Sequence, residues 1–168
     1  EAIAAKVAAL YGAQYDVDAE ITVTAGATQA IFTAVAALVH PGDEVIVFTP
    51  MYDSYAPSVE LQGGKVVYAH LTLPDYRPDW DEVARLITPR TRMIILNSPH
   101  NPTGTVWTAE DMAQLEALVK DTDIVLLSDE GTHGVRPSAP RKRAALPRPG
   151  RTQPGGFQLR QDVPHHRM

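Results

Sequence analysis

Short, continuous apolar runs separated by segments of helical character constrain the fold of this chain more than any other feature. The runs typical of strands span residues 21–24, 44–48, 65–69, 93–96 and 124–127. Helical patterns span residues 1–11, 27–39, 53–62 and 79–87, with Asp79 as a candidate cap of the last of these, and another begins at Thr108. A continuous apolar strand is buried on both faces. The alternation therefore predicts an α/β fold containing part of a doubly wound, mostly parallel sheet with helices on both faces.

Polar or glycine-containing segments follow the predicted strands. They are residues 24–26, 49–52 and 97–104, and Asp129. Parallel strands end at the same edge of a sheet, and ligands of such sheets bind at that edge. We therefore expect a functional site where these segments meet.

The chain has no cysteine, which excludes disulfides and thiolate metal sites. No segment has the length and apolar character of a membrane span or of a signal peptide. The cytoplasm is thus the expected location, with no membrane partner. Because the chain opens at Glu1 inside a helical pattern, we expect further residues before it in the intact protein.

Charge is distributed unevenly along the chain. Residues 1–130 hold seven Lys or Arg and nineteen Asp or Glu, whereas residues 131–168 hold eight basic residues, one acidic residue and six prolines. A basic tail of this kind is typical of disordered, nucleic-acid-binding segments. One interpretation is therefore a non-catalytic phosphate- or nucleotide-binding α/β domain with such a tail. Against it, no Gly-x-Gly-x-x-Gly and no Gly-x-x-x-x-Gly-Lys-Ser/Thr motif is present.

Gly26, Ala27 and Thr28 lie where a strand is predicted to turn into a helix. Free backbone N–H groups and the helix dipole make such a corner an anion site. Small residues let a phosphate approach, and Thr28 adds a hydroxyl donor. The alternative is an ordinary tight turn.

Three further side chains suit the edges and face of a planar ring. Tyr52 follows a strand and offers an aromatic face, although it could equally pack beneath a loop. Asn101, in a proline-stiffened turn, could donate to a ring oxygen or bond its own backbone. Asp129 at a strand end requires a partner, which could be a protonated pyridine nitrogen or a salt bridge. We interpret His100 and Tyr55 as structural and predict no metal site.

In this order and spacing, these segments resemble the large domain of the fold-type I aminotransferases, which use pyridoxal 5'-phosphate. The resemblance covers residues 1–130. Segments 52–55, 90–92 and 98–102 are most similar to the branch acting on methionine and other bulky amino acids. The resemblance implies that the intact protein transfers an amino group from an amino acid to a 2-oxo acid, and that it is a homodimer that binds no nucleic acid.

The resemblance also implies a role for each candidate residue. Gly26, Ala27 and Thr28 would hold the cofactor phosphate. Tyr52 would stack on the ring, Asn101 would bond the ring oxygen, and Asp129 would hold the pyridine nitrogen. The predicted cofactor site therefore comprises Gly26, Ala27, Thr28, Tyr52, Asn101 and Asp129.

The resemblance ends after Glu130. The family continues with Val-Tyr, then a Ser-x-x-Lys segment whose lysine binds the cofactor covalently, and later an arginine for the substrate carboxylate. None of these is present, and Lys142, the only later lysine, lies in the basic run Pro140-Arg141-Lys142-Arg143. We therefore expect no catalytic lysine in this chain and no catalytic competence.

A shifted reading frame explains this break. Read one base later, one allowed choice of codons for residues 157–168 encodes SSFGKTYHITG, the family's lysine segment. Residues 131–136 likewise permit EHMVYD, and the middle of the tail permits ESVLRYPGLAARSLVV. We therefore predict that residues 1–130 are part of a cofactor-binding large domain and that residues 131–168 are a frameshifted, disordered tail without a packed core.

Overall fold

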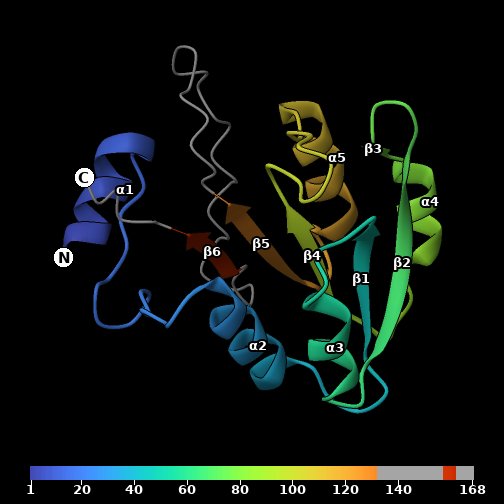
Figure 1. Cartoon of the computed structure of the whole chain (residues 1–168), viewed down its shortest axis with the longest axis horizontal. Helices are drawn as coiled ribbons and strands as arrows, with labels where there is room; N and C mark the ends of the chain where they lie inside the picture. Colours follow the sequence, from blue (N-terminus) through green and yellow to red (C-terminus); the bar gives the residue numbers. More distant parts are fainter. Residues whose placement is uncertain (132–156, 162–168) are drawn as a thin grey trace.

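The computed structural model describes residues 1–131 and the backbone of residues 157–161 (Figure 1). Its strands form one sheet in the order β3-β2-β1-β4-β5-β6. Every neighbouring pair is parallel except β2 with β3. The strands are β1 (Glu44–Thr49), β2 (Lys65–Thr72), β3 (Arg77–Pro78), β4 (Thr91–Asn97), β5 (Val125–Gly131) and β6 (Phe157–Gln161). The helices are α1 (Ala2–Tyr11), α2 (Ala27–Leu38), α3 (Tyr55–Glu60), α4 (Trp80–Leu86) and α5 (Ala109–Val119).

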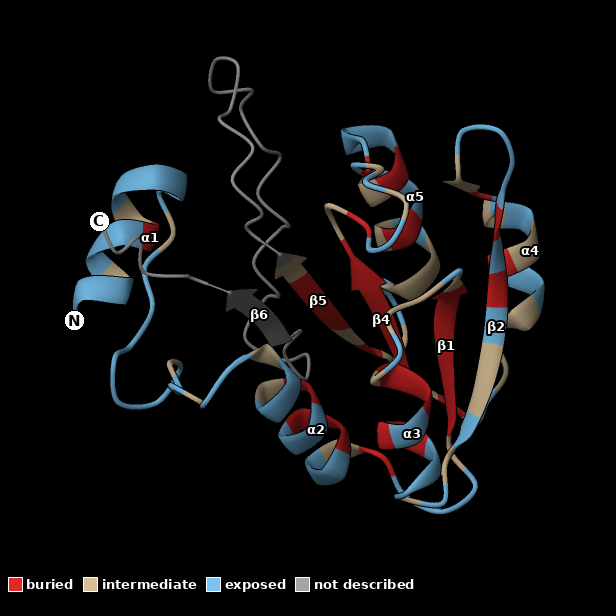
Figure 2. Ribbon diagram, viewed as in Figure 1, coloured by how far each residue is buried: buried red, intermediate tan, exposed pale blue. Residues whose placement is uncertain are grey.

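Helices cover both faces of the central strands, as predicted (Figures 1 and 2). Val45 and Val47 of β1 belong to an apolar cluster with residues of α2 and α3. Ile46 and Phe48, which alternate with them, belong to a second cluster with residues of α4 and α5. Because successive side chains of a strand point to opposite faces, a strand between two helical layers must be apolar throughout. The α/β fold class and the mostly parallel sheet are therefore confirmed.

The starts of α4 and α5 follow from local capping chemistry. The Asp79 side chain accepts hydrogen bonds from the backbone N–H groups of Asp81 and Glu82, each at 3.0 Å. At α5, Thr108 and Asp111 form a reciprocal capping box. Both caps satisfy N–H groups that a helix end leaves without an intrahelical partner. The predicted cap at Asp79 is thus confirmed.

The strand predicted over residues 21–24 is wrong, because this segment has no regular structure. Val23 is 78% exposed, and none of the described strands pairs with the segment. β-branched residues favour a strand only where neighbours pair with its backbone and bury its side chains. The segment instead links α1, which lies apart from the central strands in Figure 1, to α2.

Two strands were not predicted from the sequence. The two-residue strand β3 pairs with the far end of β2, which extends to Thr72 rather than ending at Ala69. β6 lies within the tail that was predicted to lack order, and its backbone pairs with β5 from Leu127↔Phe157 to Gly131↔Gln161. The backbone groups along the side of β5 away from β4 would otherwise be unpaired, so a further strand completes them. Residues 132–156 and 162–168 lie outside the described residues.

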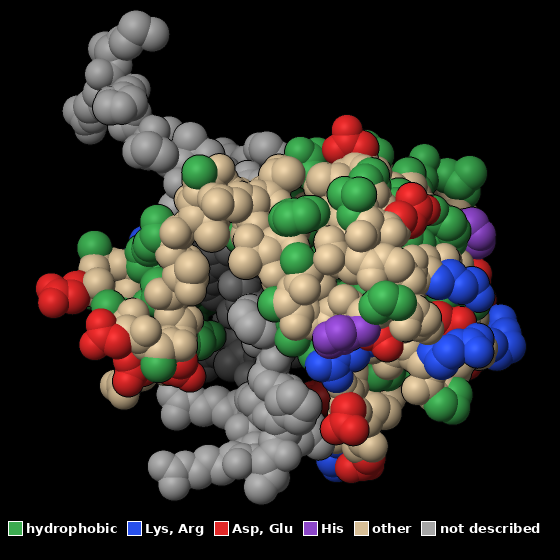
Figure 3. Space-filling view, turned by 90° about the horizontal axis from the view of Figure 1, so that it is seen from below, with side chains coloured by type: hydrophobic (Ala, Val, Ile, Leu, Met, Phe, Trp, Pro, Cys, Tyr) green, Lys and Arg blue, Asp and Glu red, His purple; other side chains and the backbone are tan. Residues whose placement is uncertain are grey.

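A buried carboxylate joins three segments at the amino edge of the sheet. Oε2 of Glu44 accepts from the Thr88 hydroxyl at 2.6 Å, and Oε1 accepts from Arg90 at 2.9 Å and from Lys65 at 3.3 Å. The Thr88 and Arg90 hydrogen bonds lower the pKa of Glu44 from 4.5 to about 2, although burial opposes this. Figure 3 views the molecule from below and shows Lys and Arg side chains gathered on the side of β1 and β2. This network fixes the loops at the end of the sheet opposite to the predicted site.

Glu44→Gln should reduce the free energy of unfolding at neutral pH by about 1–3 kcal/mol, because a hydrogen bond to a charged group contributes more stability than one between neutral groups. The folded-state pKa near 2 lies below the ordinary value of 4.5. This stabilisation is therefore complete above the ordinary value and is lost as the pH falls through the folded-state value. Urea unfolding from neutral to acid pH measures it, with Glu60→Gln, exposed on α3, as the control. A difference between wild type and Glu44→Gln that stays constant into acid would contradict this role.

Candidate functional site

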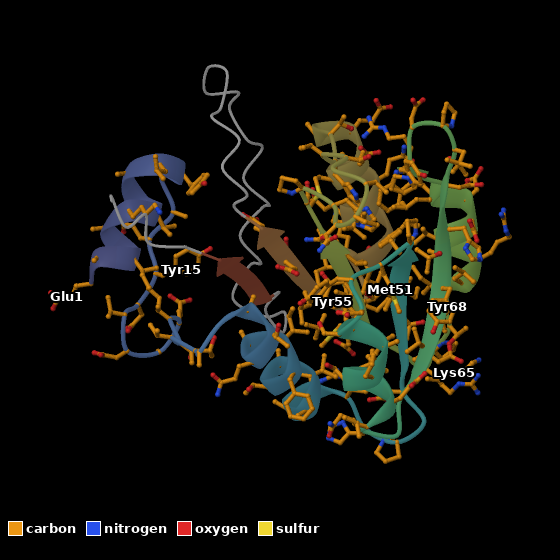
Figure 4. All side chains as sticks on the ribbon, viewed as in Figure 1. Glu1, Tyr15, Met51, Tyr55, Lys65 and Tyr68 are labelled. Atoms are coloured by element: carbon orange, nitrogen blue, oxygen red, sulfur yellow. The ribbon has the colours of Figure 1, made fainter. Side chains whose placement is uncertain are left out.

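Asp129 is a buried carboxylate near the carboxyl end of β5. Its residue is 5% exposed. The hydroxyl of Tyr55, at the start of α3, donates to Asp129 Oδ2 at 2.7 Å. Figure 4 labels Tyr55, which lies in the middle of the molecule between its helix and the sheet. Because a buried carboxylate is costly unless it is hydrogen-bonded, this contact explains how Asp129 is retained inside the fold.

Tyr55 also connects Asp129 to Tyr52. The two tyrosine rings meet edge to face, with centroids 5.8 Å apart and an interplanar angle of 71°. Burial raises the pKa of Tyr55, and the neighbouring Asp129 carboxylate raises it further. The hydroxyl therefore stays protonated and remains a donor at any physiological pH. Tyr55 was interpreted as structural, and its contact with Tyr52 was not predicted. The two residues face each other across the turn before α3, where the Tyr55 N–H donates to the Tyr52 backbone oxygen at 3.4 Å.

The Pro-stiffened segment after β4 is held to β5 by Asn97. The Asn97 side chain donates from Nδ2 to the backbone oxygen of Asp129 at 2.8 Å. Its Oδ1 accepts from the backbone N–H of Asn101 at 2.6 Å. The Ser98 N–H also donates to the Asp129 oxygen, at 3.1 Å. Sequence reasoning placed Asn97 in the motif but assigned it no contact, because its partners depend on the pairing of β4 with β5.

His100 acts within the loops, as its structural interpretation predicted. Its ring Nδ1 lies 2.8 Å from the hydroxyl oxygen of Thr103, and its side chain also bonds the backbone of Pro50. Burial lowers the pKa of His100, while the Pro50 bond partly opposes this. The imidazole is therefore neutral at physiological pH. It joins the loop carrying Asn101 to the loop carrying Tyr52.

The amino end of α2 is an open corner. Gly26 is its N-cap residue, has φ of 100°, and leaves the first-turn N–H groups without a side-chain cap. That φ favours glycine, and a Cβ built there would meet no atom within 4 Å. Gly26 and Thr28 are exposed and Ala27 is half-buried. Among the described residues no side chain caps the N–H groups of this corner, which is the arrangement of an anion site.

The described contacts connect three of the predicted residues. Tyr52 reaches Asp129 through Tyr55, and Asn101 reaches Asp129 through Asn97. The corner at Gly26, Ala27 and Thr28 is not part of this hydrogen-bonded network. Helix α2, which begins at this corner, contacts the site through packing. Its Ile31 shares an apolar cluster with Tyr55, and Tyr52 packs against the same cluster.

Within the part of the chain that the structure describes, no group of His, Cys, Asp and Glu side chains is arranged to hold a metal ion. No helix among these residues has the length and apolar character needed to span a membrane.

A parallel sheet with an acid, an amide and an aromatic ring at its carboxyl edge is an α/β domain with polar groups where such sheets bind ligands. The family model described as aminotransferase class I and II matches residues 1–135. The chain belongs to this aminotransferase family.

Known relatives agree with this membership. Methionine aminotransferase from Escherichia coli strain K12 is 53% identical over 130 residues, covering 77% of this chain and 34% of the relative. A probable N-succinyldiaminopimelate aminotransferase from Mycobacterium tuberculosis is 45% identical over 132 residues, covering 77% and 33%. The crystal structure of YbdL from Escherichia coli, described as having a methionine aminotransferase function, superposes with a TM-score of 0.75 at 52% identity. It covers 76% of this chain and 34% of that one. The chain thus spans about a third of the length of these relatives.

Tyr55→Phe should destabilise the fold by about 1–3 kcal/mol, because it removes a donor from a buried carboxylate oxygen. Tyr68→Phe is the matched control, since Tyr68 lies on β2 and its residue is 42% exposed. We expect the control to change stability by less than about 0.5 kcal/mol. Urea unfolding of the two variants and the wild type provides the measurement. Equal losses in both variants would argue against a special role for the Tyr55–Asp129 bond.

Proposed function

We propose that this chain is a fragment of a pyridoxal-phosphate-dependent aminotransferase that moves an amino group from an amino acid to a 2-oxo acid. The observation that carries this proposal is the buried Asp129 carboxylate, held by Tyr55 at the carboxyl edge of the sheet and joined through Asn97 to Asn101. A buried acid at this edge suits a cationic ring nitrogen. Family membership supports the same reaction class.

The residues present fit the cofactor. Asp129 would face the pyridine nitrogen and favour its protonated form, and the exposed Asn101 would donate to the ring oxygen. Tyr52 would lie against the ring face. The open corner at Gly26–Thr28 would receive the phosphate through backbone N–H groups and the Thr28 hydroxyl. When bound, the cofactor supplies an electron sink for bond cleavage next to the amino group.

Methionine or another bulky amino acid is the proposed amino donor. This rests on the 53% identity to the Escherichia coli methionine aminotransferase. By the same similarity we propose a homodimer in the cytoplasm for the intact protein, with small-molecule substrates and no nucleic-acid partner.

We also propose that the frame changes just after Glu130 and that residues 131–168 are out of frame. In the shifted reading, the lysine codon spans the codons of Gln161 and Asp162. The position of β6 supports this, since its backbone ends at Gln161, opposite Gly131 and two residues past Asp129. A lysine emerging there would follow the strand next to the acid. As written, the chain has no lysine at this point and is expected to lack aminotransferase activity.

The purified chain should bind free pyridoxal phosphate without covalent attachment. Asp129→Asn should raise the dissociation constant about tenfold or more, because it removes the charge that favours the cationic ring nitrogen. Asp123→Asn, exposed just before β5, is the matched control and should bind like the wild type. Absorbance titration measures affinity. Equal binding by all three chains would show that Asp129 does not hold the ring.

Borohydride treatment tests the missing lysine. We expect no stoichiometric cofactor–lysine adduct in this chain, as read by mass spectrometry. A stoichiometric adduct at one position, with amino transfer to a 2-oxo acid, would overturn the assignment of the break. Sequencing the gene around the Glu130 codon provides an independent check, since codons that do not encode the family's lysine segment in the shifted frame would refute the frameshift.

A further inference from the structure

Asn97 is a buried amide whose two ends bond to two different parts of the site. It is the last residue of β4 and is 6% exposed. It lies opposite Asp129 in the register of β4 and β5. Its Nδ2 donates to the Asp129 backbone oxygen at 2.8 Å, and its Oδ1 accepts from the Asn101 N–H at 2.6 Å. Both polar ends of this side chain are therefore engaged, one with each segment.

The two segments that Asn97 joins carry the two polar contacts expected at opposite edges of the cofactor ring. Asp129 is buried in the sheet, whereas Asn101 is an exposed residue in the loop that follows β4. A loop has no strand register of its own to set its distance from β5. The Asn97 amide supplies that constraint, because its length and planarity fix the Asn101 backbone relative to the Asp129 backbone.

We propose that Asn97 is a positioning residue that sets the separation of Asn101 and Asp129 and thereby determines how tightly, and in which protonation state, the cofactor ring is held. The effect on the cofactor rests on the proposed function. The link that the Asn97 side chain makes between Asn101 and Asp129, here called the clamp, can be tested without any cofactor.

Substitution of Asn97 by alanine should disrupt the contact between the two segments. It removes both side-chain hydrogen bonds and leaves the Asn101 N–H without the Asn97 acceptor. The Ser98 N–H would still donate to the Asp129 oxygen at 3.1 Å, so the sheet end itself stays joined. The expected result of Asn97→Ala is thus a loosened loop on an otherwise intact sheet.

Thr91→Ala is the matched control. Thr91 is the first residue of the same strand, is also buried, and its hydroxyl accepts from the Thr88 N–H at 2.9 Å. It therefore loses one side-chain bond to a loop at the opposite edge of the sheet. If Asn97 only stabilised the fold, Asn97→Ala and Thr91→Ala would have the same effect on hydrogen exchange at Asn101 and on cofactor binding.

The first measurement is amide hydrogen exchange of the full 168-residue chain without cofactor. We expect the Asn101 N–H to be protected in the wild type and in Thr91→Ala, and to exchange about tenfold or more faster in Asn97→Ala, while amides of β1 stay protected. An Asn101 N–H that exchanges at the unprotected rate in the wild type overturns the clamp, and this readout stands even if Asn97→Ala fails to fold. Unchanged protection in a folded Asn97→Ala overturns it equally.

The second measurement is binding of pyridoxal phosphate by the same three chains. We expect Asn97→Ala to raise the dissociation constant about tenfold and to shift the pH dependence of the bound cofactor's absorbance, whereas Thr91→Ala leaves both unchanged. Wild-type affinity and an unchanged absorbance profile in Asn97→Ala would overturn the cofactor part of the proposal. Absence of binding by the wild type would overturn the proposed function and this part with it, while the exchange result would still decide the clamp.

Discussion

The parallel pairing of β4 with β5 is the constraint on which the site depends. It places Asn97 beside Asp129, two polar residues buried where two apolar strands end. Each strand is apolar because helices cover both faces, so a shift in register would move the polar residues at the strand ends into an apolar layer without their partners. The cost of burying an unpaired polar group therefore keeps Asn97 opposite Asp129.

The two edges of the sheet hold buried carboxylates of different character. At the amino edge, Glu44 receives three side-chain donors, two of them charged. At the carboxyl edge, Asp129 receives the neutral Tyr55 hydroxyl. Glu44 therefore belongs to a network of charged side chains at the amino edge, whereas Asp129 lies at the edge where parallel sheets bind their ligands.

The apolar runs predicted β1, β4 and β5 because a strand buried on both faces is recognisable from its own residues. β2 was predicted from the same kind of run, although most of its residues are exposed or half-buried. The same reasoning failed at residues 21–24, where β-branched residues have no neighbouring strand. It also missed β3 and β6, which are defined by pairing with β2 and β5 rather than by their own pattern. Pairing is a property of two segments, so composition of one segment does not reveal it.

The sequence by itself determined the class of fold and the cap at Asp79, and its resemblance to a family supplied the residues that we propose hold the cofactor. These features depend on the spacing and the chemistry of residues that are close in sequence. Only the tertiary structure decided that Tyr55 donates to Asp129 and that Asn97 joins Asp129 to Asn101. The Tyr55 bond and the Asn97–Asp129 bond span 74 and 32 residues of sequence. They exist only because the sheet register and the docking of α3 bring distant backbone segments within hydrogen-bond distance.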